Sequence, residues 1–319
     1  MPKVSILVPC CNVEKYVEEC LISIKNQTLR DIEVICINDG STDSTLDLIN
    51  RCTVGDDRFI VINKPNSGYG DSMNLGLGLA KGEYIGIVES DDFIEPNMFE
   101  LLYENAKKFD LDVSRACYFH LRNGKDEINP CPLLPKNQVY EPKTITSVFF
   151  QVPSIWAAIY KTEWLRQWGI NFLATPGASY QDTSFAFKVN LMAKRCMVIE
   201  DCLLHYRLHG ENSVKSKGKV FTICNEYAEC IRFAKEHKLS DIAGNIIPAM
   251  QYKTYKWNYF RLDPELAHEF FMHWVKEWRA LRDSGFTPKS WTFSQQLKFK
   301  LITEYPSLFE WDLRRKRKN

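Results

Sequence analysis

Three carboxylates stand within four residues in Glu89-Ser90-Asp91-Asp92, directly after the apolar segment Tyr84–Val88. Carboxylates this close together are costly to bury unless something neutralises them. A hard divalent cation such as Mn²⁺ or Mg²⁺ prefers oxygen ligands and often shares them with substrate phosphates. Taken alone, the cluster is equally compatible with a solvated acidic turn that caps the next helix.

A second polar segment, Asn38-Asp39-Gly40-Ser41, follows another apolar, β-branched run. An aspartate at this place can accept a hydrogen bond from the imide of a nucleobase. Gly40 permits a tight turn or a close backbone approach. The bland alternative is an ordinary Asp-Gly turn followed by a helix cap.

A third segment, NKPNSGYG at residues 63–70, is small, polar and rich in glycine, and it precedes a predicted helix. The N-terminus of a helix favours anions, and Lys64 adds a positive charge. The GK[ST] signature of a P-loop is absent. Gly76 and Gly78 fall inside the predicted helix, so a dinucleotide-binding fingerprint is unsupported.

The elements that must position these segments alternate between strands and helices. Strands are expected at Lys3–Val8, Ile32–Asn38, Phe59–Ile62 and Tyr84–Val88, and helices at 14–26, around 46–52, at 71–80 and at 96–109. This alternation predicts an α/β fold with a mostly parallel sheet and helices on both faces. Ligands of such sheets bind beyond the carboxyl ends of the strands, where all three polar segments fall.

The remainder of the chain is less regular. Residues 119–150 contain four prolines and are expected to form an irregular excursion, followed by a strand at Ile155–Tyr160 and helices near Glu163–Trp168 and Asp182–Ala193. Nineteen of the 41 aromatic residues lie within 216–319, where apolar residues recur at helical spacing. We therefore expect a catalytic domain at 1–215 and a helical, aromatic-rich region at 216–319.

The order PxxN, NDGS, NxG and ESDD, each after a strand or before a helix, resembles the family 2 glycosyltransferases of the GT-A fold. The resemblance covers residues 3–110 strongly and weakens towards 180–213. It implies inverting transfer of a sugar from a nucleotide-diphosphate sugar to a hydroxyl of a glycan or lipid-linked acceptor, in surface polysaccharide synthesis. It also implies Mn²⁺ or Mg²⁺ as cofactor.

The resemblance assigns roles to individual residues. Asp91 matches a metal ligand, whereas Glu89 stands where the family usually has aspartate and reaches the cation on a longer arm. Asp39 matches the aspartate that recognises the base, and it suits the N–H of uracil, so a UDP-sugar is favoured. The residues expected to contact the donor are Pro9, Asn12, Asp39, Asn66, Gly68 and Ser90.

The expected general base is Asp182 in the segment YQDTSF at 180–185, where Gln181 replaces the family's usual glutamate. Base catalysis needs one carboxylate near the acceptor hydroxyl, so this departure leaves the base in place. Helix capping is the alternative role of Asp182. His209 matches a histidine that often binds the cation or the diphosphate, with a structural role equally open, and His205 is expected to be packed.

Composition narrows the classes of partner and compartment. With 41 basic and 40 acidic residues the chain lacks the basic field that nucleic acid requires. No run of 18 apolar residues and no signal-peptide pattern occurs, which predicts a cytoplasmic protein, with the inner face of the membrane as an alternative location. The basic end LRRKRK and the aromatic C-terminal region suggest peripheral membrane contact, unless the aromatics pack a helical core.

Two other functions fit parts of the pattern. A non-catalytic sugar-binding or assembly protein could be built on the same fold, because a fold does not determine an activity. The presence of both Asp91 and Asp182 favours the enzyme. A nucleotidyltransferase would show a glycine-rich, basic loop after the first strand, which PCCNVEKY does not supply.

Overall fold

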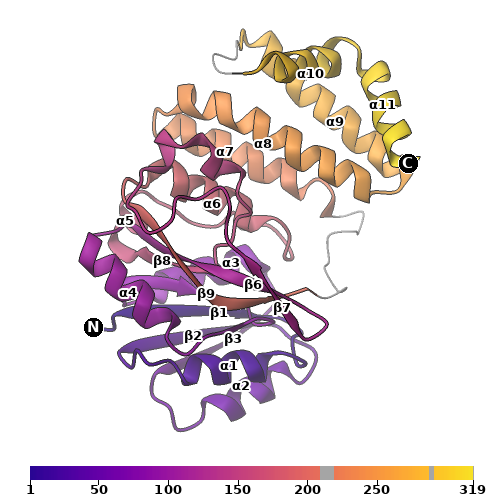
Figure 1. The fold of residues 1–319 in the computed structure, drawn as a ribbon. Coiled ribbons are helices and arrows are strands. Elements are labelled where there is room, and N and C mark those ends of the chain that lie inside the picture. Colours follow the sequence, from indigo (N-terminus) through magenta and orange to yellow (C-terminus); the bar gives the residue numbers. More distant parts are fainter. Residues whose placement is uncertain (209–218, 287–290, 319) are drawn as a thin grey trace. The chain divides into compact units, whose positions relative to one another are not determined.

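The computed structural model describes residues 1–208, 219–286 and 291–318 (Figure 1). The chain divides into two compact units, Met1–Glu211 and Asn212–Asn319. The predicted domain boundary at 215 lies outside the described residues, as does His209.

The first unit is built on one nine-stranded sheet of order β3-β2-β1-β4-β8-β6-β9-β5, with β7 paired to β6. The first four strands in the chain are parallel neighbours: β1 (Val4–Cys10), β2 (Ile32–Asp39), β3 (Phe59–Lys64) and β4 (Tyr84–Ile87). β1, β2 and β4 are buried along their whole length, which explains their continuous apolar runs.

Four helices connect or follow these strands: α1 (Val17–Lys25), α2 (Thr45–Thr53), α3 (Tyr69–Leu79) and α4 (Met98–Phe109). The path β1-α1-β2-α2-β3 runs outward along the sheet, and β3-α3-β4 then runs back across it. Because such crossovers are right-handed, α3 covers the face opposite to α1 and α2, as Figure 1 shows. Ligands of such sheets bind at this reversal, beyond the carboxyl ends of β1 and β4.

The second half of the sheet is mixed. β8 (Ala158–Lys161) pairs antiparallel with both β4 and β6 (Val113–Arg122), and β9 (Cys196–Arg207) runs parallel to β6. The two-residue β5 (Phe93–Ile94) pairs antiparallel with β9. The α/β fold with a GT-A-type sheet is thus confirmed, with parallel order in its N-terminal half and mixed order beyond it.

Residues 119–150 are expected to be irregular, and for residues 119–129 that prediction is wrong. They complete a hairpin between β6 and β7 (Lys125–Asn129), closed by Asn123 and Gly124 at φ values of 50° and 75°. Positive φ at both turn residues is what a two-residue hairpin loop requires, and Asn-Gly is its preferred sequence. Short 3₁₀ turns at Pro142–Thr144 and Thr146–Phe150 follow.

Two further helices complete the first unit, α5 (Thr162–Gln167) and α6 (Gln181–Met192). α6 begins one residue before Asp182, close to the predicted start. Its apolar residues surround the helix axis rather than forming a stripe, in keeping with burial of most of its side chains.

The second unit contains five described helices: α7 (Thr222–Glu236), α8 (Ser240–Arg261), α9 (Pro264–Asp283), α10 (Phe293–Glu304) and α11 (Pro306–Lys318). Asp263 caps α9 by accepting from the Leu266 N–H at 2.9 Å. The aromatic residues Phe270, Phe271, Trp274 and Trp278 of α9 are all buried, so they form the core of this unit. Among the described residues, no helix is both long and apolar enough to span a bilayer.

Candidate functional site

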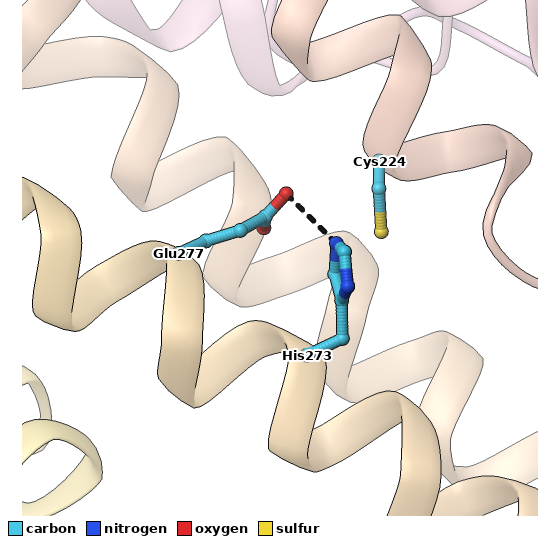
Figure 2. Close-up of side chains that lie close together, drawn as sticks. All are labelled: Cys224, His273 and Glu277. Carbon is cyan, nitrogen blue, oxygen red and sulfur yellow. Dashed lines mark hydrogen bonds and ion pairs between the residues drawn. The ribbon is translucent and has the colours of Figure 1, made fainter.

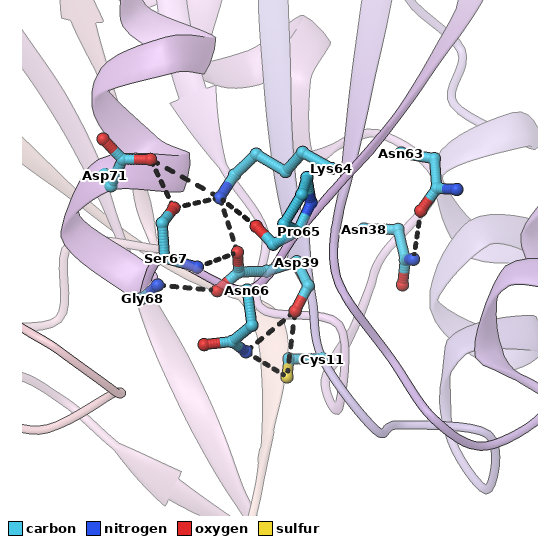
Figure 3. Close-up of polar contacts among 10 residues, drawn as sticks. All are labelled: Cys11, Asn38, Asp39, Asn63, Lys64, Pro65, Asn66, Ser67, Gly68 and Asp71. Atoms are coloured by element: carbon cyan, nitrogen blue, oxygen red, sulfur yellow. Dashed lines mark hydrogen bonds and ion pairs between the residues drawn. The ribbon is translucent and has the colours of Figure 1, made fainter.

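Asp39 ends β2 with its carboxylate turned into the loop before α3 (Figure 3). Its Oδ1 accepts from Lys64 Nζ at 2.5 Å and from the Ser67 N–H at 2.9 Å, and its Oδ2 accepts from the Gly68 N–H at 2.9 Å. Partial burial works to raise the pKa of Asp39, but these three donors outweigh it and lower the pKa. A carboxylate offers about four lone-pair positions, so there is room for one more donor.

Two glycines allow the loops around Asp39 to approach each other. Gly40 has φ +65°, and a Cβ there would lie 2.6 Å from the backbone N of Asn66. Gly68 has φ +99°, and its Cβ would lie 2.6 Å from the carbonyl of Thr175. Asn66 donates from Nδ2 to the Asp39 carbonyl at 2.8 Å. The predicted donor residues Asp39, Asn66 and Gly68 therefore meet in one place.

Asn12 joins the loop after β1 to the loop after β2. Its backbone is left-handed at φ 55°, its N–H donates to Ser41 Oγ at 3.0 Å, and its Oδ1 accepts from the Thr42 N–H at 2.8 Å. Pro9 lies inside β1, opposite Ile37 of β2. Both residues stand beside the Asp39 loop at the carboxyl end of the parallel strands.

Glu89 follows β4, and Tyr69 is the first residue of α3. The Tyr69 hydroxyl donates to Glu89 Oε1 at 2.6 Å. The Glu89 carboxylate is partly accessible but densely surrounded by protein. This burial raises its pKa to about 8, against the effect of the Tyr69 hydrogen bond; the charges of Asp91 and Asp182 raise it further. Ser90 is buried and hydrogen bonded to the Cys10 thiol, so it packs inward at the end of β1.

Asp92 connects the acidic turn, residues 89–92, to the end of β9. Its Oδ1 accepts from the Arg207 N–H at 2.8 Å, and Arg207 Nε donates to the Asp91 carbonyl at 2.9 Å. Burial and then the charge of Asp91 raise the pKa of Asp92 well above its usual range. No described residue hydrogen bonds to the buried Oδ2 of Asp92. An uncompensated carboxylate oxygen among other carboxylates fits a nearby cation.

Asp182 lies in the first turn of α6, and its carboxylate accepts from the N–H groups of Thr183 and of Asp182 itself. Burial is the larger effect and raises its pKa to about 6. The charge of Asp182 also acts on Glu89 and on Tyr69. The predicted base and the predicted metal ligands therefore share one region of the structure, which is the arrangement that acid–base chemistry next to a cation requires.

Gln181 closes the loop that precedes α6. Its Oε1 accepts from the Ser179 N–H at 2.5 Å, and its Nε2 donates to Thr175 Oγ1 at 2.9 Å. The same loop receives the Tyr69 N–H on the carbonyl of Gly177 at 3.0 Å. The Gln181 amide thus both donates and accepts within the loop that leads to Asp182.

The predicted site residues of the N-terminal half lie within the match to a protein-family model. The model of glycosyl transferase family 2 matches residues 5–165, half of the chain, and includes Asp39, Glu89 and Asp91. The chain belongs to glycosyl transferase family 2.

Curated relatives and solved structures agree with this family. The uncharacterized glycosyltransferase EpsJ of Bacillus subtilis is 31% identical over 214 residues, 65% of this chain and 61% of EpsJ. Chondroitin synthase of Pasteurella multocida is 41% identical over 119 residues, 37% of this chain and 12% of the synthase. The chain thus spans less than two thirds of the length of these curated relatives.

The fold matches solved glycosyltransferase structures. S. aureus TarS 1–349 in complex with UDP-GlcNAc has a TM-score of 0.63 at 21% identity, covering 79% of this chain and 73% of TarS 1–349. The mannosyltransferase PcManGT from Pyrobaculum calidifontis, in complex with GDP-Man and Mn²⁺, has a TM-score of 0.56 at 16% identity. The match covers 97% of this chain and 88% of PcManGT. At these identities the likeness concerns the fold.

Near the carboxylates of the acidic turn, Tyr206 packs against Trp156, a residue that sequence reasoning does not single out. Their rings stack at 4.9 Å with an interplanar angle of 4°. Burial, followed by the charges of all four acidic groups (Asp92, Asp91, Asp182 and Glu89), raises the pKa of Tyr206. Tyr206 therefore faces the carboxylates as a neutral phenol.

His205, the neighbour of Tyr206, is packed as predicted. It lies between Glu95 and Asp126, each 2.9 Å from a ring nitrogen, and it stacks on Phe93 at 4.2 Å. His209 lies outside the described residues.

Proposed function

We propose that this family 2 member is a cation-dependent, inverting glycosyltransferase that moves a sugar from a nucleotide-diphosphate sugar to a hydroxyl group. The acceptor is a glycan or a lipid-linked glycan, and the pathway makes a surface polysaccharide. The observation that carries the proposal is the junction at Tyr69: its hydroxyl bonds to the acidic turn through Glu89, and its N–H bonds to the loop before Asp182 through Gly177.

The Asp39 loop is the proposed place of the nucleotide. Asp39 already accepts three hydrogen bonds, and its remaining lone pair can accept the imide N–H of uracil. A guanine also carries a suitable N–H, and a direct comparison of UDP with GDP distinguishes the two donors. The two solved structures with a similar fold hold both classes of nucleotide, UDP-GlcNAc in TarS and GDP-Man in PcManGT.

Asp91 and Glu89 are the proposed ligands of Mn²⁺ or Mg²⁺, with His209 as a further candidate ligand. Carboxylates are suitable ligands for both ions. A divalent cation bound here would neutralise charge on the leaving nucleoside diphosphate. The Tyr69 hydroxyl favours the charged form of Glu89, which is the form that can act as a ligand.

Asp182 is the proposed general base. Its carboxylate is oriented by the N–H groups of the first turn of α6, and Gln181 fixes the loop that leads into this turn. A pKa of about 6 leaves Asp182 mostly deprotonated at neutral pH yet more basic than an ordinary aspartate. It can then take the proton of an acceptor hydroxyl that attacks the anomeric carbon from the face opposite to the leaving group.

The second unit is proposed to contact an anionic membrane surface on the cytoplasmic side. The aromatics of α9 form a core, but Phe293, Leu308 and Trp311 are exposed on α10 and α11. A hollow of about 1000 Å³ in this unit is lined mainly by aromatic and basic side chains, with one acidic residue among them. The lining residues are Tyr259, Pro264, Glu265, His268, Trp311, Arg314, Arg315 and Arg317. Exposed aromatic rings beside cations suit the headgroup boundary.

Two of these cations already have partners within the unit. Arg314 pairs with Glu310 at 2.9 Å, and Arg315 pairs with Asp312 at 3.5 Å. Flotation of the full chain with anionic and with neutral vesicles tests the contact. We expect binding to anionic vesicles at low salt that a chain ending at Asp312 loses, and equal recovery of both chains in the unbound fraction would refute it.

The enzymatic proposal is tested by incubating the full chain with a panel of nucleotide sugars in the presence of Mn²⁺ or Mg²⁺. We expect slow release of the nucleoside diphosphate from one UDP-sugar, which Asp91→Ala abolishes. A sugar-binding protein without catalytic activity would bind a donor or glycan and release no diphosphate with any of them.

A further inference from the structure

A cluster of three different ligand-type side chains lies inside the second unit, remote in sequence from the acidic turn. Cys224 stands on α7, and His273 and Glu277 stand one turn apart on α9 (Figure 2). One ligand atom from each of the three lies within 4.8 Å of the other two. The spacing of four residues places His273 and Glu277 on the same face of α9.

Two of the three side chains, His273 and Glu277, are held in place by contacts with neighbouring side chains. His273 Nε2 is 3.2 Å from Glu277 Oε1, and Glu277 Oε2 accepts from the Tyr255 hydroxyl of α8 at 2.9 Å. The Phe221 ring meets the imidazole edge-on at 5.3 Å. Because Tyr255 is fully buried, its hydroxyl holds the Glu277 carboxylate in one orientation. Outer hydrogen bonds of this kind orient the ligands of metal sites.

We propose that Cys224, His273 and Glu277 bind one Zn²⁺ ion, which clips α7 to α9. Sulfur, imidazole nitrogen and carboxylate oxygen are the three donor types that zinc accepts, usually in a tetrahedral arrangement. The thiolate favours zinc over Mg²⁺ and Mn²⁺, which prefer oxygen ligands. The cluster is therefore a second, chemically different site from the acidic turn of the first unit.

The geometry needs only a small adjustment. Tetrahedral zinc with ordinary bond lengths places neighbouring ligand atoms roughly 3.3–3.8 Å apart. The 3.2 Å contact between His273 and Glu277 is already close to this spacing, so the remaining contraction concerns the Cys224 sulfur. His273 and Glu277 keep 39% and 27% of their side-chain surfaces exposed, which gives the ion a path from solvent and lets both side chains rotate.

Binding follows a simple balance of protons and bonds. Zinc in solution loses water ligands and gains bonds to sulfur, nitrogen and oxygen, while the Cys224 thiol gives its proton to solvent. No redox partner is involved. Water completes the fourth position. Because α7 and α9 hold the ligands together only when the unit is folded, zinc stabilises the fold.

The test uses the full chain, first stripped with a chelator and then dialysed. Zinc titration by calorimetry, metal content after gel filtration and thermal unfolding with and without zinc are measured on the wild type and on Cys224→Ser. Cys230→Ser is the matched control, because it removes another buried thiol of α7 that is not in the cluster. Cobalt substitution adds a spectroscopic signature, the thiolate-to-cobalt charge-transfer band.

We expect one zinc per chain in the wild type and in Cys230→Ser, a zinc-dependent rise in melting temperature, and a charge-transfer band with cobalt. Cys224→Ser and His273→Ala should each lose the band or shift it and bind zinc at least about 100-fold more weakly. Tyr255→Phe should keep the stoichiometry and lose about 10–100-fold in affinity, the usual effect of removing an outer hydrogen bond.

Zinc held by the acidic turn would give a different result. Asp91→Ala should leave the cobalt band and the zinc-dependent stabilisation unchanged. The proposal is overturned if Cys224→Ser binds zinc as tightly as Cys230→Ser does, or if the wild type shows no charge-transfer band and no change in melting temperature. If Cys224→Ser does not fold, His273→Ala on the exposed side of the cluster decides the matter by the same measurements.

Discussion

The hydroxyl of Tyr69 donates to Glu89 Oε1 at 2.6 Å, so the first residue of α3 is tied to the acidic turn that follows β4. The two residues are 20 positions apart in the chain, on either side of the crossover from α3 to β4. The bond favours the charged form of a glutamate whose surroundings raise its pKa to about 8. Tyr69 therefore helps to keep Glu89 available as a cation ligand at neutral pH.

Tyr69→Phe removes this bond and keeps the ring that packs edge-on against Phe172. The pKa of Glu89 should rise further, so the fraction of charged glutamate at pH 7 falls. A hydrogen bond to a charged group contributes about 1.5–3 kcal/mol, so we expect Mn²⁺ to bind roughly tenfold more weakly at pH 7. At pH 9 the difference should shrink, because a larger fraction of Glu89 is then ionised in both proteins. Calorimetric Mn²⁺ titration at the two pH values measures it, and equal affinities at pH 7 would contradict the role of Tyr69.

Asp182→Asn keeps the size of the side chain and removes the proton acceptor. Donor affinity should remain, while transfer falls by about 10²–10⁴-fold, the usual contribution of general-base catalysis. Because the base acts in its charged form and burial raises its pKa to about 6, kcat/KM of the wild type should increase with pH through about 6. The transfer rate as a function of pH and the anomeric configuration of the product are the measurements. A product that retains the donor's configuration, or a wild-type rate that does not change between about pH 5 and 7, would exclude this role.

Gly68→Ala tests the close approach of the loop before α3 to the loop before α6. A Cβ at Gly68 would lie 2.6 Å from the Thr175 carbonyl, on a backbone with φ +99°. We expect donor affinity to fall by tenfold or more, measured by calorimetry with UDP. Gly78→Ala is the matched control, since no described residue outside its own helix turn has an atom within 4 Å of its Cβ position in α3. That variant should bind UDP normally and gain about 0.5–1 kcal/mol of stability. Equal UDP affinity of both variants would show that the approach is unimportant.

The prediction of a uracil nucleotide as donor depends on Asp39. Calorimetry with UDP, GDP, CDP and TDP should show the tightest binding for UDP. Asp39→Ala should weaken UDP binding by tenfold or more, because the carboxylate that accepts from the base is removed. The same variant leaves the donors of Lys64, Ser67 and Gly68 without their acceptor. Lys25→Ala, at the far end of α1, serves as a variant without a role in the loop. A clear preference for GDP would refute the assignment of the donor as a uridine nucleotide.

Elements whose pattern is local could be predicted from the sequence. The strands β1 to β4 are continuous apolar runs bounded by polar turns, and Asp39, Glu89 and Asp91 directly follow or end them. β9 is not predicted because Glu200 and Asp201 interrupt its apolar run, where the pairing with β6 is also irregular. The two-residue β5 exists only through its pairing with β9.

The supporting residues of the site could not be predicted for a similar reason. Tyr69 and Gln181 act through partners that are distant in the chain or specific to one loop conformation, which no spacing rule encodes. The stacking of Trp156 on Tyr206 joins residues that are far apart in the sequence. By contrast, the hairpin at Asn123-Gly124 has a sequence signal, because Asn-Gly between strand-forming residues is typical of two-residue turns.

The most direct test of the central claim is the rate of nucleoside diphosphate release from a UDP-sugar, measured for the wild type and for Asp91→Ala with Mn²⁺, and for the wild type in excess EDTA. Because Asp91 is the proposed cation ligand and the cation neutralises the leaving diphosphate, we predict turnover for the wild type with Mn²⁺ only. Asp91→Ala should keep its fold by circular dichroism and lose turnover at every Mn²⁺ concentration. Full turnover of the wild type in excess EDTA, or of Asp91→Ala with Mn²⁺, would contradict the account.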